Sequence, residues 1–219
     1  MCGRYSIAVE SSEVEKHFRA TFTEPIKPRY NAAPSQKLPV ILNFNPRKIV
    51  LTRWGLKPAW LSKISKRDGL INVRAETLKE KHTFQSDLAE RRCLIPADGF
   101  YEWKALPNGK KTPYRIVRKD GQLFTFAGIW EEDKSNGTLE PRFAIITTEA
   151  NEIMNPIHGR MPVILETRQE ALWLGAKVPI SEPLNMLGSA PSRDLRAYEV
   201  SPMVNRGTID TPEIINPAA

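Results

Sequence analysis

The sequence predicts an α+β fold, with a mainly antiparallel curved sheet or β-barrel-like core and short helices at its periphery. Three observations predict it. Apolar, β-branched runs outnumber segments with helical spacing, and most of them follow one another through hairpin-like turns. The 18 prolines are spread along the chain, which favours short elements. A length of 219 residues is enough for one sizeable core, so we expect a single domain over residues 1–219.

The first half of the chain contains two expected helices and one expected hairpin. A short helix is predicted in SSEVEKHF, with Ser12 as its N-cap, and it should end before Pro25. Irregular chain is expected in RYNAAPSQ (29–36). A hairpin is predicted by LPVILNF and KIVLTRWGL on either side of NPRK. A second helix is predicted in FQSDLAERR, where Arg91 and Arg92 complement the helix dipole at the C-terminus.

Strand signals dominate the second half of the chain. We expect a strand in RCLIPADGFYEWK, interrupted at Pro96 and at Asp98-Gly99. The clearest hairpin is expected in PYRIVRKDGQLFTFAGIWE, because its two strand-like runs flank Asp120-Gly121, a pair favoured in type I′ turns.

The remaining elements follow in order. A turn in NGTLE leads to a strand in RFAIITTEA. A short helix, a Pro/Gly-rich loop and another strand are expected in ANEIMNPIHGRMPVIL. A helix closed by Gly175 is predicted in TRQEALWLG, and a last strand in RAYEVS. Strands and turns with only occasional helices are the pattern on which the predicted fold class rests.

The overall composition is that of an ordinary globular protein, with 41% hydrophobic and 26% charged residues. No stretch is long and apolar enough to span a bilayer, and the N-terminus lacks a secretory pattern, so we expect a cytoplasmic protein of bacterial type. The formal net charge is +7, which favours a polyanionic partner. With DNA as that partner, the protein would be nucleoid-associated when bound.

Neither a disulfide framework nor a metal site is expected. The two cysteines, Cys2 and Cys93, are too few for a secreted disulfide scaffold. Cys93 lies in an apolar stretch and is interpreted as an inert core thiol. The three histidines, His17, His82 and His158, are scattered without the spacing of a zinc site. We therefore expect no metal and no cofactor.

Cys2 is a special case because it becomes the first residue once Met1 is removed. Its free α-amine, with a pKa of about 7.7–8.0, and its thiol would then form a 1,2-aminothiol. The neutral amine condenses with an aldehyde to a Schiff base, and the thiolate adds to the imine to close a thiazolidine ring, helped by the high effective molarity of an intramolecular step. From its position alone, Cys2 could equally be a small apolar residue at the start of the chain.

Six short motifs occur in order along the chain: MCGRY at the start, RYNAAPSQ, RWGLKPAW, NVRAET (72–77), CLIPADGFYEW (93–103) and NPIHGRMPVIL (155–165). Together they resemble the SOS-response-associated peptidase (SRAP) family, from Cys2 to about Val200. The resemblance implies a compact fold with a β-barrel-like core and a positively charged channel for DNA. It also implies binding of single-stranded DNA with abasic sites, and a thiazolidine crosslink between the N-terminal Cys and the ring-opened sugar.

The resemblance assigns the catalytic role, position by position, to Cys2, Asn72, Glu102 and His158. Glu102 has aromatic neighbours, which would raise its pKa and suit it to move protons during sugar ring opening and to the Cys2 amine. His158 would relay protons in ring opening and in reversal of the crosslink. Asn72 would orient the amine or the sugar through hydrogen bonds. Without the resemblance, solvated side chains would be the favoured interpretation of Glu102 and His158, and a turn or capping residue is the alternative for Asn72.

DNA contacts are expected from six further side chains: Arg4, Arg74, Arg160, Trp60, Thr148 and Asn151. The three arginines each lie within two residues of a proposed catalytic residue, and guanidinium groups bind phosphates in a bidentate manner. Surface solubility is the alternative explanation for them. Trp60 is the best candidate for stacking on a base, whereas Trp54 and Trp103 could either stack or belong to the core. The threonine and the asparagine are expected to line the same pocket.

The residues leave three functions open. The first is a monomeric enzyme that crosslinks itself to abasic sites, with AP lyase and autopeptidase activity as accompanying reactions. The second is a cysteine peptidase that uses Cys2 as an N-terminal nucleophile. The third is a non-catalytic module that binds single-stranded DNA. The basic charge and the three arginines favour the first function.

Overall fold

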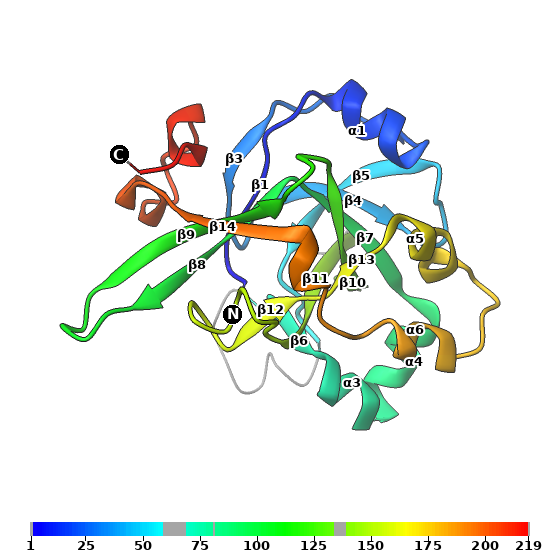
Figure 1. Cartoon of the computed structure of the whole chain (residues 1–219). Coiled ribbons are helices and arrows are strands. Elements are labelled where there is room, and N and C mark those ends of the chain that lie inside the picture. Colours follow the sequence, from blue (N-terminus) through cyan, green and yellow to red (C-terminus); the bar gives the residue numbers. More distant parts are fainter. Residues whose placement is uncertain (1, 59–68, 81, 134–138, 219) are drawn as a thin grey trace.

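The computed structural model describes residues 2–58, 69–80, 82–133 and 139–218, which form two β-sheets with short helices around them (Figure 1). No helix in this part of the chain is long and apolar enough to cross a membrane. Within the same residues, no group of three or more His, Cys, Asp or Glu side chains is arranged to hold a metal ion.

The first sheet carries the start of the chain. Within the described residues it has five strands in the order β14-β9-β8-β1-β3, and all neighbouring pairs are antiparallel. The strands are β1 (Tyr5–Ile7), β3 (Arg29–Ala32), β8 (Gly99–Ala105), β9 (Lys111–Arg118) and β14 (Leu195–Glu199). A tight turn at Asn108-Gly109 joins β8 to β9, and Gly109 has a φ of +77°, a conformation that L side chains rarely adopt.

The second sheet closes into a barrel. Its strands are β2 (Thr21–Phe22), β4 (Lys37–Leu42), β5 (Lys48–Trp54), β6 (Asn72–Arg74), β7 (Arg92–Ala97), β10 (Phe124–Asp133), β11 (Glu140–Glu149), β12 (Arg160–Pro162) and β13 (Ile164–Leu165). β11, β10, β7, β4 and β5 pair in that order, and β5 then pairs in parallel with β11, with Trp54 opposite Phe143. This closed ring confirms the predicted α+β class with a barrel-like core.

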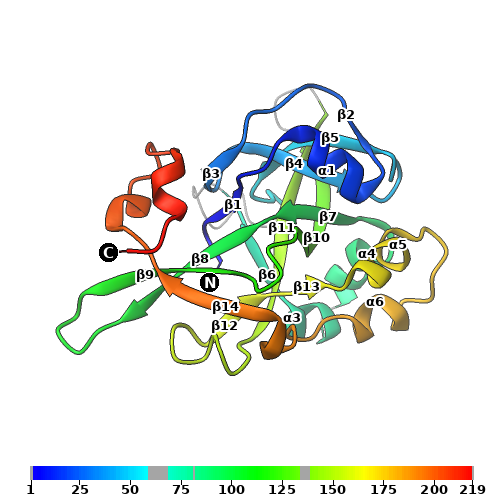
Figure 2. The same cartoon turned by 45° about the horizontal axis from the view of Figure 1, so that its top comes forward.

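Short helices cover the outside of the barrel (Figures 1 and 2). The α-helices are α1 (Ser11–Phe18), α3 (Ala75–Glu80), α4 (His82–Glu90), α5 (Thr167–Leu174) and α6 (Ser181–Asn185). The 3-10 helices are η1 (Ser192–Asp194), η2 (Pro202–Asn205) and η3 (Pro212–Ile215). The C-terminal segment with η2 and η3 packs against the five-stranded sheet, on the side of β8 that carries Tyr101 and Trp103.

Two apolar layers hold these parts together. One joins the five-stranded sheet to the barrel and contains Cys2 from the start of the chain, Tyr5 and Phe100 from the first sheet, and Trp54 and Phe126 from the second. The other joins the barrel strands to the helices, with members such as Val14, Ile41, Leu88, Ala127 and Trp173. Because both faces of β7 and β10 are covered, these strands are buried at nearly every position instead of alternating between core and solvent.

Several predicted elements are confirmed. β4 and β5 form the expected antiparallel hairpin, and β11 and β14 lie where strands were predicted. α1 and α5 match predicted helices, and Gly175 is the C-cap of α5. Arg92 follows α4 and donates hydrogen bonds to Leu88 O and Ala89 O, so a cation caps this helix end as expected.

Three local predictions are wrong. Ser12 is not the N-cap of α1, because the cap is Glu10, and the side chain of Ser11 donates to Ile26 O at 3.0 Å. The stretch predicted as irregular at 29–36 begins with β3, which completes the edge of the first sheet beside β1. Consecutive turns replace the short helix expected after residue 150. The predicted turn in NGTLE lies largely outside the described residues.

The predicted hairpin around Asp120-Gly121 is also wrong. The turn is present, with a φ of +71° at Gly121, but β9 pairs with β8 and β14, whereas β10 pairs with β7, β11 and β13. The strand predicted over 92–104 is likewise two strands in different sheets, since the chain leaves the barrel at Asp98, and Pro96 lies inside β7. Local turn chemistry reverses the chain, but long-range burial of both strand faces decides which strands pair.

Candidate active site

The start of the chain is held in the core beside β8. Cys2 is fully buried in the layer between the two sheets. Its neighbour Arg4 accepts a hydrogen bond of 3.0 Å at its carbonyl oxygen from Tyr101 N. Continued toward the N-terminus, the antiparallel register of β1 and β8 places Gly3 opposite Glu102, so Cys2 is one residue away from that position in the chain.

Glu102 is the buried carboxylate of this site. It is 2% exposed and lies on the same face of β8 as Phe100, which packs in the layer that contains Cys2. Burial raises the pKa of Glu102, while nearby positive charges, that of His158 among them, lower it. Burial and, secondly, the Glu102 carboxylate raise the pKa of the Cys2 thiol well above its ordinary value. These mutual electrostatic effects place the thiol, the carboxyl and the imidazole at one site.

Asn72 connects the barrel to the chain start. It is the first residue of β6, which runs parallel to β11 with Asn72 opposite Ile145. Asn72 Nδ2 donates a hydrogen bond of 2.8 Å to Cys2 O. Its Oδ1 is buried and has no hydrogen-bond partner among the described residues. An unsatisfied buried acceptor costs about 1–3 kcal/mol, so this oxygen is suited to receive a donor from a bound molecule.

His158 lies in the loop between β11 and β12, which is closed by a hydrogen bond of 3.2 Å from Ala150 N to Gly159 O. His158 Nδ1 accepts a hydrogen bond of 3.0 Å from Arg160 N, and Arg160 O lies 3.3 Å from the same nitrogen. In the neutral ring Nδ1 is thus an acceptor and Nε2 carries the proton, whereas in the charged ring Nδ1 can donate to Arg160 O. Both charge states have a backbone partner, as a proton relay requires.

Two of the three arginines expected at phosphates make hydrogen bonds within the protein. Arg160 Nη1 and Nη2 donate to the two carboxylate oxygens of Glu76 at 2.8 and 3.0 Å, and the Arg160 hydrogen bond lowers the pKa of Glu76. Arg4 Nη1 donates to Asn31 Oδ1 and to Val204 O, both at 2.9 Å. Both guanidinium groups therefore brace the site, and a phosphate would have to share them with these partners.

Arg74 and the tryptophans differ in exposure. Arg74, at the end of β6, is exposed and makes no side-chain hydrogen bond to a described residue. Trp54 is fully buried in the core, and Trp103 donates to Asn205 Oδ1 at 2.6 Å beneath the C-terminal segment. Trp60 lies outside the described residues. Arg74 is thus the expected arginine that is most open to a phosphate.

Asn151 and Thr148 support the His158 loop. Asn151 Nδ2 donates to Ala190 O at 2.9 Å, and its Oδ1 accepts from Met154 N at 3.0 Å, so this amide shapes the turns that precede His158. Thr148 lies in β11 and is 7% exposed. The structure brings both residues near the His158 loop, and the side-chain amide of Asn151 is occupied by hydrogen bonds within the fold.

Tyr114 is a residue of this site that sequence reasoning missed. It lies directly opposite Glu102 in the β8–β9 pair, is half-buried and packs against the layer that contains Cys2. Side chains directly opposite each other in antiparallel strands share a face. The signal that could have found it is the turn sequence around Asn108-Gly109, because a hairpin centred on Asn108 aligns residue 114 with residue 102.

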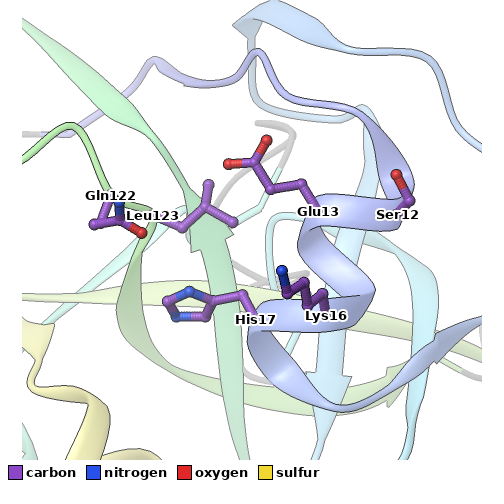
Figure 3. Close-up of a pocket in the computed structure, with 6 residues that line it drawn as sticks. All are labelled: Ser12, Glu13, Lys16, His17, Gln122 and Leu123. Atoms are coloured by element: carbon purple, nitrogen blue, oxygen red, sulfur yellow. The ribbon is translucent and has the colours of Figure 1, made fainter.

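A separate hollow lies between α1 and the segment that precedes β10 (Figure 3). It has a volume of about 640 Å³ and is lined by Ser12, Glu13, Lys16, His17, Gln122 and Leu123. His17 Nε2 lies 3.9 Å from Glu170 Oε1, which accepts a hydrogen bond of 2.6 Å from Thr125 Oγ1. None of the residues expected at the reactive site lines this hollow, so it is not part of the Cys2 site.

Comparisons with known proteins agree with this picture. The profile of the SOS response associated peptidase (SRAP) family matches residues 1–207. The chain is similar to the abasic site processing protein YoqW of Bacillus subtilis (strain 168), with 40% identity over 221 residues, covering 98% of this chain and 99% of the relative. It is similar also to the abasic site processing protein HMCES of Xenopus tropicalis, with 30% identity over 264 residues, covering 97% of this chain and 77% of the relative.

Solved structures share the fold. A protein from Bacteroides thetaiotaomicron superposes with a TM-score of 0.86 at 26% identity, covering 100% of both chains. A phage-related protein from Bordetella bronchiseptica superposes with a TM-score of 0.74 at 27% identity, covering 91% of this chain and 94% of the other.

Proposed function

The chain belongs to the SOS response associated peptidase (SRAP) family, and from this membership and the geometry around Cys2 we propose that the protein captures abasic sites in single-stranded DNA. The proposed product is a thiazolidine that joins Cys2, after removal of Met1, to the aldehyde of the ring-opened sugar. The relatives named abasic site processing proteins support an activity in AP-site processing. The covalent chemistry and the single-stranded partner are proposed from the residues of the site.

The observation that carries the proposal is the hydrogen bond between Asn72 and Cys2. One amide atom of Asn72 holds Cys2 O at 2.8 Å, and the other is a buried acceptor with no partner among the described residues. An acceptor at this position suits the hydrogen of the Cys2 amine, or a sugar hydroxyl. It would orient the amine toward an aldehyde beside Glu102.

Ring opening comes first in the proposed reaction. The abasic sugar is a closed hemiacetal, and opening it requires a proton on the ring oxygen and loss of a proton from the hydroxyl on C1′. Glu102, whose pKa is raised by burial, and His158 are the groups that would move these two protons. The product is a free aldehyde at C1′, and no atom is gained or lost.

Capture then takes place in two bond-forming steps. The neutral amine of Cys2 adds to C1′, the resulting carbinolamine loses water, and a Schiff base remains. The thiol proton passes to the Glu102 carboxylate, Sγ bonds to C1′, and the electron pair of the C=N bond moves to nitrogen, which takes up a proton. The balance is one water released and one five-membered ring formed, with no oxidant or reductant.

The state of the thiol favours this chemistry over peptide hydrolysis. Burial raises the pKa of Cys2, so the thiol is protonated when a substrate arrives. A cysteine peptidase uses the thiolate as its first nucleophile. In aldehyde capture the amine attacks first and the thiol is needed only afterwards, once Glu102 can accept its proton.

An intact-mass measurement followed by a crosslinking assay tests the proposal. Protein shown by mass to lack Met1 should form a heat- and SDS-resistant adduct with single-stranded DNA that contains one abasic site. Cys2→Ala should form none, whereas Cys93→Ala, which alters the other buried thiol, should crosslink like the parent. An unmodified oligonucleotide, or the same heat-stable adduct from Cys2→Ala, would overturn it.

A further inference from the structure

The hairpin of β8 and β9 extends beyond the rest of the fold. In Figures 1 and 2 its end projects away from both sheets. On the β8 edge, the outermost backbone hydrogen bond to the N-terminal segment runs from Tyr101 N to Arg4 O. On the β9 edge, the outermost backbone hydrogen bond comes from Val200 N, just after β14, to Pro113 O. Among the described residues, the strands of the arm, residues 104–112, have only each other as sheet partners.

The root of this arm is fixed to the catalytic strand. Trp103 packs beneath the C-terminal segment and donates to Asn205 Oδ1 at 2.6 Å, which braces β8 at the point where the arm begins. At the tip, Leu106 N donates to Lys110 O at 2.8 Å and closes the turn. The arm therefore leaves the body in a direction that is set by the same strand that carries Glu102.

The arm is strongly basic. Residues 103–119 contain no Asp or Glu. Two buried or half-buried arginines nearby are paired, Arg115 with Asp98 and Arg118 with Asp120. The three lysines of the arm, by contrast, make no ion pair in the described part of the chain; they are Lys104, Lys110 and Lys111.

The lysines begin close to the reactive site. Lys104 lies two residues beyond Glu102 on the same face of β8, which is about 7 Å along the strand. Ala105 and Lys111 are opposite each other one residue further out, and the exposed Lys110 follows in the turn. Because side chains alternate along a strand, Lys111, opposite Ala105, lies on the other face of the arm from Lys104. Cations that make no ion pair with described residues thus begin beside the proposed abasic-site pocket and continue to the tip on both faces of the arm.

We propose that the β8–β9 arm binds the phosphate backbone of the single-stranded DNA that flanks the lesion. The inference rests on the proposed function, which places a nucleic-acid strand at Glu102, and it assigns the next phosphates of that strand to Lys104, Lys110 and Lys111. The strand is the partner that fits, because it is a polyanion that must leave the pocket beside the root of the arm. Lysine pairs with phosphate as a point charge and without sequence preference.

Lysines on exposed edge strands have a second known use, which is to prevent strand edges from pairing between molecules. The two uses predict different results. If the lysines bind phosphates, their removal changes DNA affinity and its salt dependence. If they only protect the edges, their removal causes self-association and leaves DNA binding by the monomer unchanged.

The test compares two triple variants with the same change in charge. One is K104A/K110A/K111A, and the control is K16A/K48A/K177A, whose exposed lysines lie on other parts of the molecule. Binding is measured by fluorescence anisotropy at several salt concentrations. The probe is a single strand of about 20 nucleotides with a central tetrahydrofuran abasic analogue, which has no aldehyde. Removing three phosphate contacts should make the slope of log affinity against log salt shallower by about 2 and weaken binding at least about tenfold near 0.1 M salt.

A second measurement separates this inference from the proposed function. The rate of crosslinking to a trinucleotide with a central reactive abasic site should be the same for the arm variant and the parent, because this substrate lacks every phosphate beyond the two directly next to the lesion. Equal salt slopes for the two triple variants would overturn the inference, as would self-association by light scattering with an unchanged slope. If the parent forms no crosslink with any substrate, the proposed function fails, and the salt slopes still decide whether the arm binds DNA.

Discussion

Glu102 is a carboxyl group whose charged form is disfavoured by the fold. It is buried next to a buried thiol, and burial raises its pKa. In the unfolded chain its pKa is about 4.3. The folded state therefore binds this proton more tightly than the unfolded chain does. The free energy of unfolding falls as the pH rises from the unfolded-state pKa to the higher folded-state pKa. At neutral pH the raised pKa therefore lowers stability, and below about pH 4 this effect is absent.

We predict that Glu102→Gln raises the midpoint of thermal unfolding at neutral pH and leaves it nearly unchanged below about pH 4. The same change removes the group that moves protons, so crosslink formation should slow by about 10²–10⁴-fold. Thermal melts and crosslinking time courses on one preparation check both effects. A variant that melts lower at neutral pH, or crosslinks at the parental rate, would contradict the role of Glu102.

Asn72 offers a second prediction at the scale of single residues. Asn72→Ala removes the 2.8 Å hydrogen bond to Cys2 O and should cost about 1 kcal/mol. Asn72→Asp puts a carboxylate against that carbonyl oxygen and should cost roughly 2–3 kcal/mol. Both changes should slow crosslinking about tenfold or more, as expected for a lost positioning contact in a reaction that depends on orientation.

Asn43 provides the matched control for Asn72. It is also 8% exposed, and it donates to Glu90 O at 2.8 Å and accepts from Trp130 Nε1 at 2.9 Å, on another part of the barrel. Asn43→Ala should lower the free energy of unfolding in urea to a similar extent without changing the crosslinking rate of the folded protein. If it slowed crosslinking as much as Asn72→Ala, the effect at position 72 would be one of stability alone.

Motifs in the sequence were enough to predict the four catalytic candidates, but not the partners of the arginines. Arg160 pairs with Glu76 and Arg4 with Val204 O, and both contacts join segments far apart in sequence. No local pattern contains such a pairing. For this reason arginines next to candidate catalytic residues were interpreted as phosphate ligands, whereas two of them also make hydrogen bonds that brace the site.

At the scale of elements, the Asp120-Gly121 signal predicted where the chain reverses but not which strands pair. Gly109 and Gly121 both have positive φ in turns that match Asn-Gly and Asp-Gly signals. Only the first turn joins neighbouring strands. β10 is buried on both faces and needs partners on both edges, and it finds them within the barrel, so the second turn connects two sheets.

The junction of α4, β7 and α5 depends on one buried guanidinium. Arg92 is fully buried and donates to Leu88 O and Ala89 O in α4, to Trp173 O in α5 and to Gly175 O at its C-cap. Arg92→Met leaves these helix-end carbonyls without a donor. We predict a loss of about 3–5 kcal/mol in the free energy of unfolding, measured by urea titration.

The neighbouring residue Arg91 is the control for this prediction. Its side chain is 42% exposed and forms a surface pair with Asp87 at 2.6 Å. Arg91→Met should therefore cost less than about 1 kcal/mol. Similar losses at the two positions would mean that charge near the end of α4, and not the buried set of hydrogen bonds at Arg92, stabilises this junction.

At the scale of the whole molecule, the fold class with its barrel-like core was predictable, and the strand pairing that closes the barrel was not. Short apolar runs and many turns indicate a β-rich α+β fold whichever strands pair. Closure depends on the parallel pairing of β5 with β11, where Arg53 lies opposite Arg142. These residues are far apart in sequence, and periodicity carries no information on such a contact. The same closure brings β6, and with it Asn72, beside the start of the chain.

The last part of the C-terminal segment, which contains η3, lies beyond the residues matched by the family profile, which end at 207. Asp210 accepts hydrogen bonds from Tyr30 N at 2.6 Å and Asn31 N at 2.8 Å, and pairs with Arg29 at 2.8 Å, so it fastens the tail to β3, the neighbour of β1. We predict that Asp210→Ala costs about 3 kcal/mol by urea titration, because two charge-assisted bonds to backbone donors are lost. Asp194→Ala, which alters an exposed carboxylate 3.8 Å from Arg193, should cost less than about 0.5 kcal/mol. Equal losses would show that the tail contributes no specific contact to the sheet that holds Cys2.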